Sequence, residues 1–269
     1  MFFMRPLMLL SALLLGMLGF SGGARAQAEE QALVDRATLT LQEMMGPADN
    51  TGDARALLRN AKGVLICPRV FRAGFFIGGE FGECVLAARG GGGSWSSPAF
   101  YSLVGGSFGL QAGLQDAQVI SLIMTERGLN AVLDSQFKFG AEAGLAFATL
   151  GRSIQGATTA AVGADIVTIG RSRGLFAGIT LDGAVLSANS SAMRAYFGRE
   201  ASARQVVVAM ELHNPGSDPL RAALMRLGAP GSGGGSSAAP APSGGTTSGS
   251  AATGRVQTEN LAPPPANRR

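Results

Sequence analysis

The stretch that decides the fold runs from Ala61 to Gly113 and reads AKGVLICPRVFRAGFFIGGEFGECVLAARGGGGSWSSPAFYSLVGGSFGLQAG. Its short apolar runs are rich in Val, Ile and Phe, and glycine or proline interrupts each of them. Runs with this punctuation are typical of strands rather than helices. From Phe75 to Ala87, bulky side chains alternate with small or polar ones and so fall on opposite faces of a strand. The stretch therefore predicts a sheet with one bulky face and one thin, glycine-rich face.

Helical patterns flank this sheet on both sides in the sequence. Apolar residues recur with the helical period from Ala28 to Met45, and Asp53 can cap a second helix that ends at Asn60 or Lys62. Further along we expect strands at 119–124, 166–169, 175–181 and 184–187, a strand pair from Phe137 to Leu150, and helices at 129–133, 190–197, 202–210 and from Asp218 to Gly228. The predicted fold class is α+β, a twisted antiparallel and barrel-like sheet with flanking helices.

The first residues of the chain have the pattern of a signal peptide. Met1–Ala26 combines a positive start, an apolar core and the small-x-small sequence Ala24-Arg25-Ala26, which is typical of a cleavage site. An uncleaved membrane anchor is the alternative. We expect a mature protein that begins at Gln27 and resides in the periplasm or outside the cell, with peripheral membrane association as an option.

The last residues differ in composition from the middle of the chain. Beyond Gly228 the sequence is dominated by Gly, Ser, Ala, Thr and Pro, which cannot bury enough apolar surface to fold. We therefore expect three parts: a signal peptide at 1–26, one folded domain at 27–227 and a flexible tail at 228–269.

The charge balance argues against a nucleic-acid partner. The chain has 22 Lys and Arg against 18 Asp and Glu. The excess of positive charge lies in the predicted signal peptide and the tail, so the predicted domain is close to neutral. A neutral domain without a basic stripe is a poor nucleic-acid binder.

Several short motifs together resemble one known family. They are Ala61-Lys62-Gly63-Val64, Pro68, Ala73-Gly74-Phe75 with Gly78-Gly79 and Gly82, Trp95-Ser96-Ser97-Pro98, the glycines from 105 to 113, Gly151-Arg152 and Ser172-Arg173-Gly174-Leu175-Phe176-Ala177-Gly178. With them the chain resembles the SYLF-domain family, a lipid-binding module of bacterial envelope proteins and of eukaryotic actin-patch and FYVE-containing proteins. The resemblance implies non-enzymatic binding of anionic phospholipid at the envelope membrane surface. No SH3 or FYVE domain accompanies the motifs, so the eukaryotic actin and endosome roles are not carried over.

The predicted lipid-binding residues are basic. Arg55, Arg59 and Lys62 follow one another at i, i+4 and i+7, so they share one flank of the predicted second helix. Arg69 and Arg72 follow shortly after. A second and weaker group, Arg171 and Arg173, shares one face of a predicted strand. Near an anionic bilayer each charge could contribute ~1 kcal/mol. A solvated charged surface without a partner is the alternative.

The two cysteines, Cys67 and Cys84, are the only ones in the chain. They fall on neighbouring predicted strands, and in an oxidising compartment such a pair is expected to form a disulfide. Two buried free thiols are the alternative.

Residues for catalysis or metal binding are scarce. The chain has one histidine, His213, and two cysteines, too few for a zinc site built from soft ligands. The glycine-rich segment from Gly105 to Gly109 lacks the lysine of a phosphate-binding loop. We therefore predict a protein that is not an enzyme and has no cofactor or metal. The alternative function is a protein-interaction or scaffolding module of the cell envelope, whose glycine face accepts a partner.

Overall fold

The computed structural model describes residues 21–46, 52–74, 77–108, 113–134, 136–139, 144–149, 163–174, 181 and 183–229. The chain divides into two units, Met1–Pro230 and Gly231–Arg269, and the described residues all belong to the first. Most of the predicted signal peptide, the predicted strand at 175–181 and nearly all of the predicted tail lie outside the described residues.

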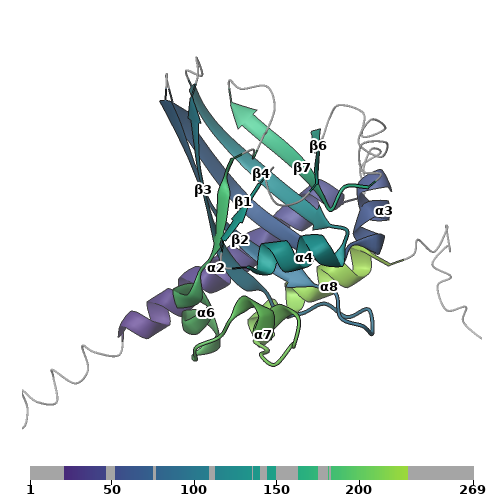
Figure 1. Ribbon diagram of the computed structural model, residues 1–269. Helices are drawn as coiled ribbons and strands as arrows, with labels where there is room; N and C mark the ends of the chain where they lie inside the picture. Colours follow the sequence, from purple (N-terminus) through teal and green to yellow (C-terminus); the bar gives the residue numbers. More distant parts are fainter. Residues whose placement is uncertain are drawn as a thin grey trace, which may run out of the picture. The chain divides into compact units, whose positions relative to one another are not determined.

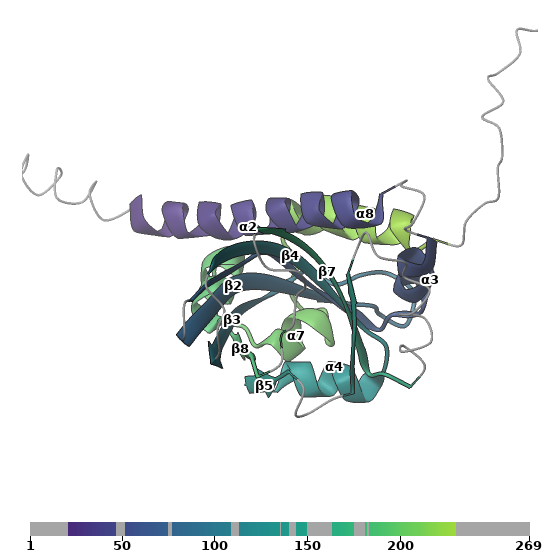
Figure 2. The same cartoon turned by 90° about the horizontal axis from the view of Figure 1, so that it is seen from above.

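The described strands form one sheet of eight strands in the order β5-β8-β3-β2-β1-β4-β7-β6 (Figure 1). Their bounds are Gly63–Gly74 (β1), Ile77–Ala88 (β2), Ala99–Phe108 (β3), Gly113–Ile123 (β4), Gln136–Lys138 (β5), Leu145–Thr149 (β6), Ile166–Gly174 (β7) and Val185–Ala188 (β8). Neighbouring strands are antiparallel, apart from the parallel pair of β6 and β7. Figure 2 shows that the sheet curls into part of a barrel. The predicted fold class, α+β with a barrel-like sheet, is confirmed.

One predicted pairing is wrong. The region from Phe137 to Leu150 does not form a strand pair, because β5 and β6 lie at opposite edges of the sheet. β5 pairs with β8, where Phe137 faces Leu186, and β6 pairs with β7. Alternating side chains indicate that a segment is a strand, but they carry no information on which strand it joins.

The described helices are α2 (Ser21–Met45), α3 (Gly52–Asn60), α4 (Glu126–Leu133), α6 (Ser190–Phe197), α7 (Ala203–Val207) and α8 (Asp218–Leu227), with a short 3-10 helix η1 at Pro215–Ser217. α2 lies across the convex, outer face of the sheet, while α7 lies on the concave side (Figure 2). The apolar stripe of α2, from Leu33 to Met45, is buried as its period predicts. α2 begins at Ser21, inside the segment predicted to be removed before Gln27.

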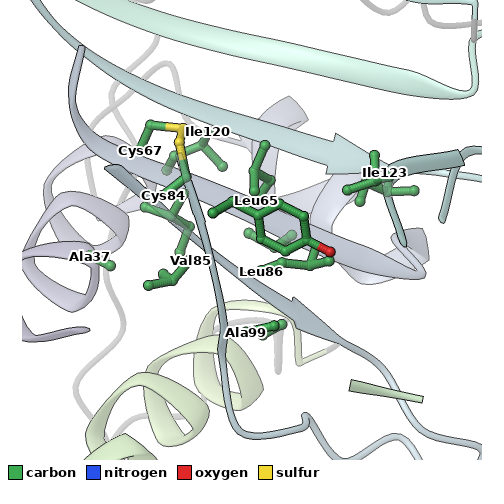
Figure 3. Packing of buried hydrophobic residues seen from close by; sticks show 14 of the residues in the cluster. Ala37, Leu65, Cys67, Cys84, Val85, Leu86, Ala99, Ile120 and Ile123 are labelled. Atoms are coloured by element: carbon green, nitrogen blue, oxygen red, sulfur yellow. A yellow bond between two sulfur atoms is a disulfide. The ribbon is translucent and has the colours of Figure 1, made fainter. Parts of the chain in front are cut away.

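A β-bulge interrupts β1 next to a disulfide. The register of β1 shifts against both β2 and β4 between Ile66 and Val70, so β1 carries an extra residue there. Pro68 lies in the bulge, where its missing N–H costs no ladder hydrogen bond. Cys67 and Cys84 are joined in a disulfide with a Cα–Cα distance of 4.1 Å. Figure 3 shows this bond among the buried apolar side chains that link β1 and β2.

Candidate lipid-binding surface

Large apolar side chains are exposed on the outer face of the sheet, beyond the part that α2 covers. In the strand register Phe71 of β1 lies opposite Phe81 of β2, and Phe81 lies opposite Val104 of β3. Paired residues project from the same face, so these side chains form one row across three strands. Leu114 of β4 lies opposite Ala73, two residues along β1 from Phe71, and so shares the face. The four side chains are 39%, 53%, 55% and 63% exposed in that order, and we call them the outer apolar patch.

A groove runs between α2 and this patch. Leu33 and Arg36 of α2 form one wall, and the sheet contributes Pro68, Arg69, Phe71, Phe81, Gly82 and Glu83 to a cavity of about 560 Å³. A second hollow of about 220 Å³ shares Arg36, Pro68 and Arg69 with the first and adds Asp116, Ala117, Gln118 and Arg171. We call the two hollows together the outer groove. Its cations are Arg36, Arg69 and Arg171.

The three arginines differ in their surroundings. Arg69 Nε lies 2.8 Å from Asp116 Oδ2, and its guanidinium lies 5.8 Å from the centre of the Phe71 ring. Within the described part of the chain, Arg36 and Arg171 have no ion-pair partner. Arg171 is exposed and lies opposite Gln118 in the register of β7 and β4. Two of the three guanidinium groups are therefore available to an anion in the groove.

Carboxylates also border the groove. Glu83 lies opposite Arg69 in the register of β1 and β2, and Asp116 pairs with the same arginine. On α2, burial raises the pKa of Glu30, and the charges of Glu83 and Glu29 raise it further. The groove is thus a mixed surface in which Arg69 is largely neutralised by its neighbours, while Arg36 and Arg171 supply the excess positive charge.

The structure spreads the predicted basic residues over several surroundings. Arg55 of α3 is half-buried, and its Nε donates to the carbonyl oxygen of Met45 at 2.7 Å, which satisfies an open group at the end of α2. Arg59 is exposed. Lys62 Nζ lies 3.4 Å from Glu126 Oε1. The α3 group is separated from Arg69 by most of the first half of β1, roughly 20 Å at the strand rise per residue.

Arg72 lies on the other face of the sheet from Arg69. Its guanidinium forms hydrogen bonds of 3.0 and 2.5 Å with Glu80 Oε2, and the two side chains are only 16% and 6% exposed. Residues three apart in a strand project to opposite faces, so Arg72 and Arg69 cannot serve one surface. Arg173 occupies the register position opposite Asp116. Of the seven predicted residues, the structure brings Arg69 and Arg171 together in the outer groove.

The sequence reasoning missed Arg36 and the outer apolar patch. Arg36 is the basic residue on an otherwise acidic side of the first predicted helix, which concealed it. Phe81 lies in the predicted strand from Phe75 to Ala87, on the bulky face, and this face carries the patch. A signal was present in Phe71, Phe81 and Val104, which are large apolar residues flanked by glycine and charged residues, but the register was needed to align them.

A serine, a histidine and an aspartate also meet, far from the groove in sequence. Ser97 Oγ lies 3.3 Å from His213 Nδ1 and 3.2 Å from Ser217 Oγ, and His213 Nε2 lies 3.6 Å from Asp218 Oδ1. Ser217 donates its single hydroxyl proton to the carbonyl oxygen of Asn214 at 2.6 Å. The donor and acceptor of the contact between Ser97 and His213 depend on which ring nitrogen of His213 carries the proton. Together these contacts tie Ser97 to the segment from Asn214 to Asp218.

Neither a metal site nor a membrane-spanning helix is present among the described residues. No group of three or more His, Cys, Asp or Glu side chains is placed to hold a metal ion there. None of the helices in the described ranges is both long enough and apolar enough to cross a membrane.

The fold and the groove define a class of protein: a binding domain built on a curled sheet, with an arginine-lined groove on its outer face. Residues 104–227 match the family model described as "Ysc84: Las17-binding protein actin regulator". The chain is 27% identical to LAS seventeen-binding protein 3 of Saccharomyces cerevisiae over 167 residues, 61% of this chain and 36% of that protein. It is 26% identical to SH3 domain-containing YSC84-like protein 1 of Homo sapiens over 184 residues, 68% of this chain and 53% of that protein. Over these residues the chain is similar to the SYLF-domain family, in line with the resemblance of its sequence motifs.

The name of the Saccharomyces cerevisiae relative refers to binding, and the family description refers to actin regulation. An SH3 domain-containing protein of Schizosaccharomyces pombe is 28% identical over 188 residues, 69% of this chain and 42% of that protein. The chain spans between about a third and about a half of the length of the relatives described here. No solved structure matches the chain.

Proposed function

We propose that this domain binds anionic phospholipid at a membrane surface through the outer groove, without catalysing a reaction. The observation that carries the proposal is the meeting of Arg36, Arg69 and Arg171 in two adjoining hollows beside exposed apolar side chains. The planar guanidinium group binds phosphate oxygens in a bidentate manner. Exposed arginine on a folded surface is common, but three arginines around one groove with an apolar border match the amphipathic chemistry of a lipid headgroup region.

The magnitude of this attraction is modest. Each basic residue near an anionic bilayer contributes ~1 kcal/mol, so the three arginines give ~3 kcal/mol at most. Asp116 and Glu83 offset part of that attraction. Binding through the arginines is therefore weak and sensitive to salt, because the Debye length falls from about 10 Å at 0.1 M salt to about 3 Å at 1 M.

We place this membrane in the periplasm or outside the cell. The predicted signal peptide supports that location, and the disulfide between Cys67 and Cys84 suits an oxidising compartment.

The test is co-sedimentation with vesicles of phosphatidylcholine alone and of phosphatidylcholine mixed with phosphatidylglycerol. The groove variant Arg36→Gln/Arg69→Gln/Arg171→Gln is expected to lose most of the binding to the anionic vesicles. The helix variant Arg59→Gln/Lys62→Gln, which changes the group predicted from helical spacing, is expected to keep it. The opposite result would move the lipid site to α3. The helix variant is a valid comparison when its free energy of unfolding equals that of the wild type. We expect this equality because exposed charges contribute little to folding.

A second candidate function is binding of a partner protein in the cell envelope. The names of the relatives favour it, since the family description is of a Las17-binding protein and several relatives carry SH3 domains. The exposed apolar patch would suit such a partner. Salt separates the two functions, because attachment to vesicles through arginine weakens with added salt whereas an apolar protein interface persists.

A further inference from the structure

The outer apolar patch is continuous over four neighbouring strands. Phe71, Phe81 and Val104 are direct cross-strand neighbours, and Leu114 stands on the next strand. Strands are spaced about 4.8 Å apart, so the patch is about 15 Å wide. Single exposed apolar side chains are normal on a protein surface, whereas a contiguous group marks a surface that contacts something apolar.

The backbone beneath the centre of the patch, at Phe71 and Phe81, is paired with neighbouring strands on both sides. The patch lies on β3, β2, β1 and β4, which are consecutive interior strands in the sheet order. Phe71 and Phe81 have paired strands on both sides, whereas the pairing of β3 with β8 ends at Val104 and that of β4 with β7 ends at Gln115. In a medium without water an unpaired N–H or C=O group costs several kcal/mol. The centre of the patch can therefore enter hydrocarbon without this cost, which an edge strand or a loop would incur.

On the side towards Gly79 the side chains next to the patch are small, whereas on β4 Asp116 lies directly opposite Phe71. The row beyond Phe81 on the same face consists of Ala73 paired with Gly79, and Gly79 paired with Gly106. Gly79 and Gly106 are exposed, and a Cβ atom built on Gly79 would meet no heavy atom within 4 Å. This row brings no polar side chain that would have to lose its hydration. The two glycines thus leave this row of the exposed face without projecting side chains.

Cations lie on the border of the patch. The guanidinium of Arg69 lies 5.8 Å from the Phe71 ring centre, and Arg36 lines the same hollow as Phe71 and Phe81. Arg171 lines the adjoining hollow. Aromatic rings with arginine beside them suit the membrane interface, where the rings enter the apolar layer and the long arginine side chains reach the phosphates. This charge pattern favours a lipid surface over a neutral apolar protein partner.

We propose that Phe71, Phe81, Val104 and Leu114 insert into the acyl-chain boundary of an anionic bilayer while Arg36, Arg69 and Arg171 bind its phosphate groups. This inference rests on the proposed lipid-binding function and adds the orientation of the domain on the membrane. The part of the outer sheet face that α2 leaves uncovered meets the membrane, and α2 lies beside it. Part of the vesicle binding then has an apolar origin and persists at high salt. Truncating one inserted aromatic ring is expected to weaken vesicle partitioning about tenfold.

The test uses tryptophan as a depth probe. Trp95 is the single tryptophan of the chain and is fully buried, so it supplies a constant background. Phe81→Trp and Val104→Trp place a second indole in the patch, and Leu39→Trp places one on α2, where Leu39 is 59% exposed but lines neither hollow. With phosphatidylcholine and phosphatidylglycerol vesicles that carry bromine on the acyl chains, the patch probes are expected to shift to the blue and to be quenched. The Leu39→Trp probe is expected to stay unquenched.

The outcomes separate the inference from the function on which it rests. If the variants co-sediment with the vesicles but neither patch probe is quenched, insertion is refuted while lipid binding stands. If no variant and no wild-type protein co-sediments, the proposed function fails as well. A Phe71→Ser/Phe81→Ser variant with native unfolding behaviour that partitions as the wild type does would also refute insertion and assign the patch to a protein partner.

Discussion

Removing the disulfide is expected to destabilise the domain without changing its fold. Cys67 and Cys84 are separated by 17 residues and are both buried. In the chain-entropy account, a cross-link that closes a loop of this length lowers the free energy of the native state relative to the unfolded state by about 3 kcal/mol. The strands it joins are also held by ladder hydrogen bonds on both sides of the bulge. The native pairing therefore survives reduction, and the loss comes chiefly from a less restricted unfolded chain.

Urea unfolding with and without a reducing agent measures this loss. The reduced protein is expected to unfold at a lower urea concentration, with a larger m value, because its unfolded state exposes more surface. A Cys67→Ala/Cys84→Ala variant serves as the control, since its unfolding should not respond to the reducing agent. A loss below about 1 kcal/mol on reduction would refute the reasoning. It would mean that the unfolded chain is already restricted in this region, or that the bulge is strained by the bond.

Three further predictions concern single residues. Hydrogen bonds from Arg127 and then Thr125 hold the pKa of buried Asp165 at about 2. The ionised carboxylate therefore contributes up to about 2 kcal/mol of stability above pH 4, which is lost as the pH falls towards 2. A pH series of urea midpoints should show this loss, and Asp165→Asn should abolish the pH dependence. Burial and neighbouring acids raise the pKa of Glu30, so its ionised form disfavours the folded state at neutral pH, and Glu30→Gln should raise the thermal midpoint at pH 7 but not at pH 3. Gly105→Ala would place a Cβ 2.3 Å from Glu80 Oε1 and should cost about 1–3 kcal/mol, whereas Gly79→Ala, with open space around it, should be nearly neutral in the same assay.

The boundaries of α6 and α8 could be predicted closely because their signals are local. α6 follows an Asn189 side chain that accepts from the N–H of Ala192, and ends at Gly198, whose φ of 70° is in the left-handed region. α8 has Pro219 in its first turn. Capping and turn residues act on backbone groups within one turn, so the sequence around them is sufficient.

The candidate site could not be predicted in the same way, because its members depend on distant partners. Arg55 is withdrawn from the surface by a carbonyl at the end of another helix. The extra residue in β1 shifts the alternation, so the face of a residue after Pro68 cannot be counted from one before it. The phenylalanines of β1 and β2 and Val104 of β3 become one row only through the pairing of three strands. These are properties of register, which local sequence specifies weakly where glycine is frequent.

The position of the disulfide has a consequence for the order of folding. Strands β1, β2 and β3 pair with their neighbours in sequence, so this meander can form from local contacts soon after Phe108 is synthesised. The addition of β8 to β3 and of β7 to β4 requires much longer loops to close, which is slower. The cysteines both lie within the early meander. Oxidation can therefore precede the assembly of the remaining sheet. The disulfide would then fix the native register of the β1–β2 hairpin before β7 and β8 join the sheet.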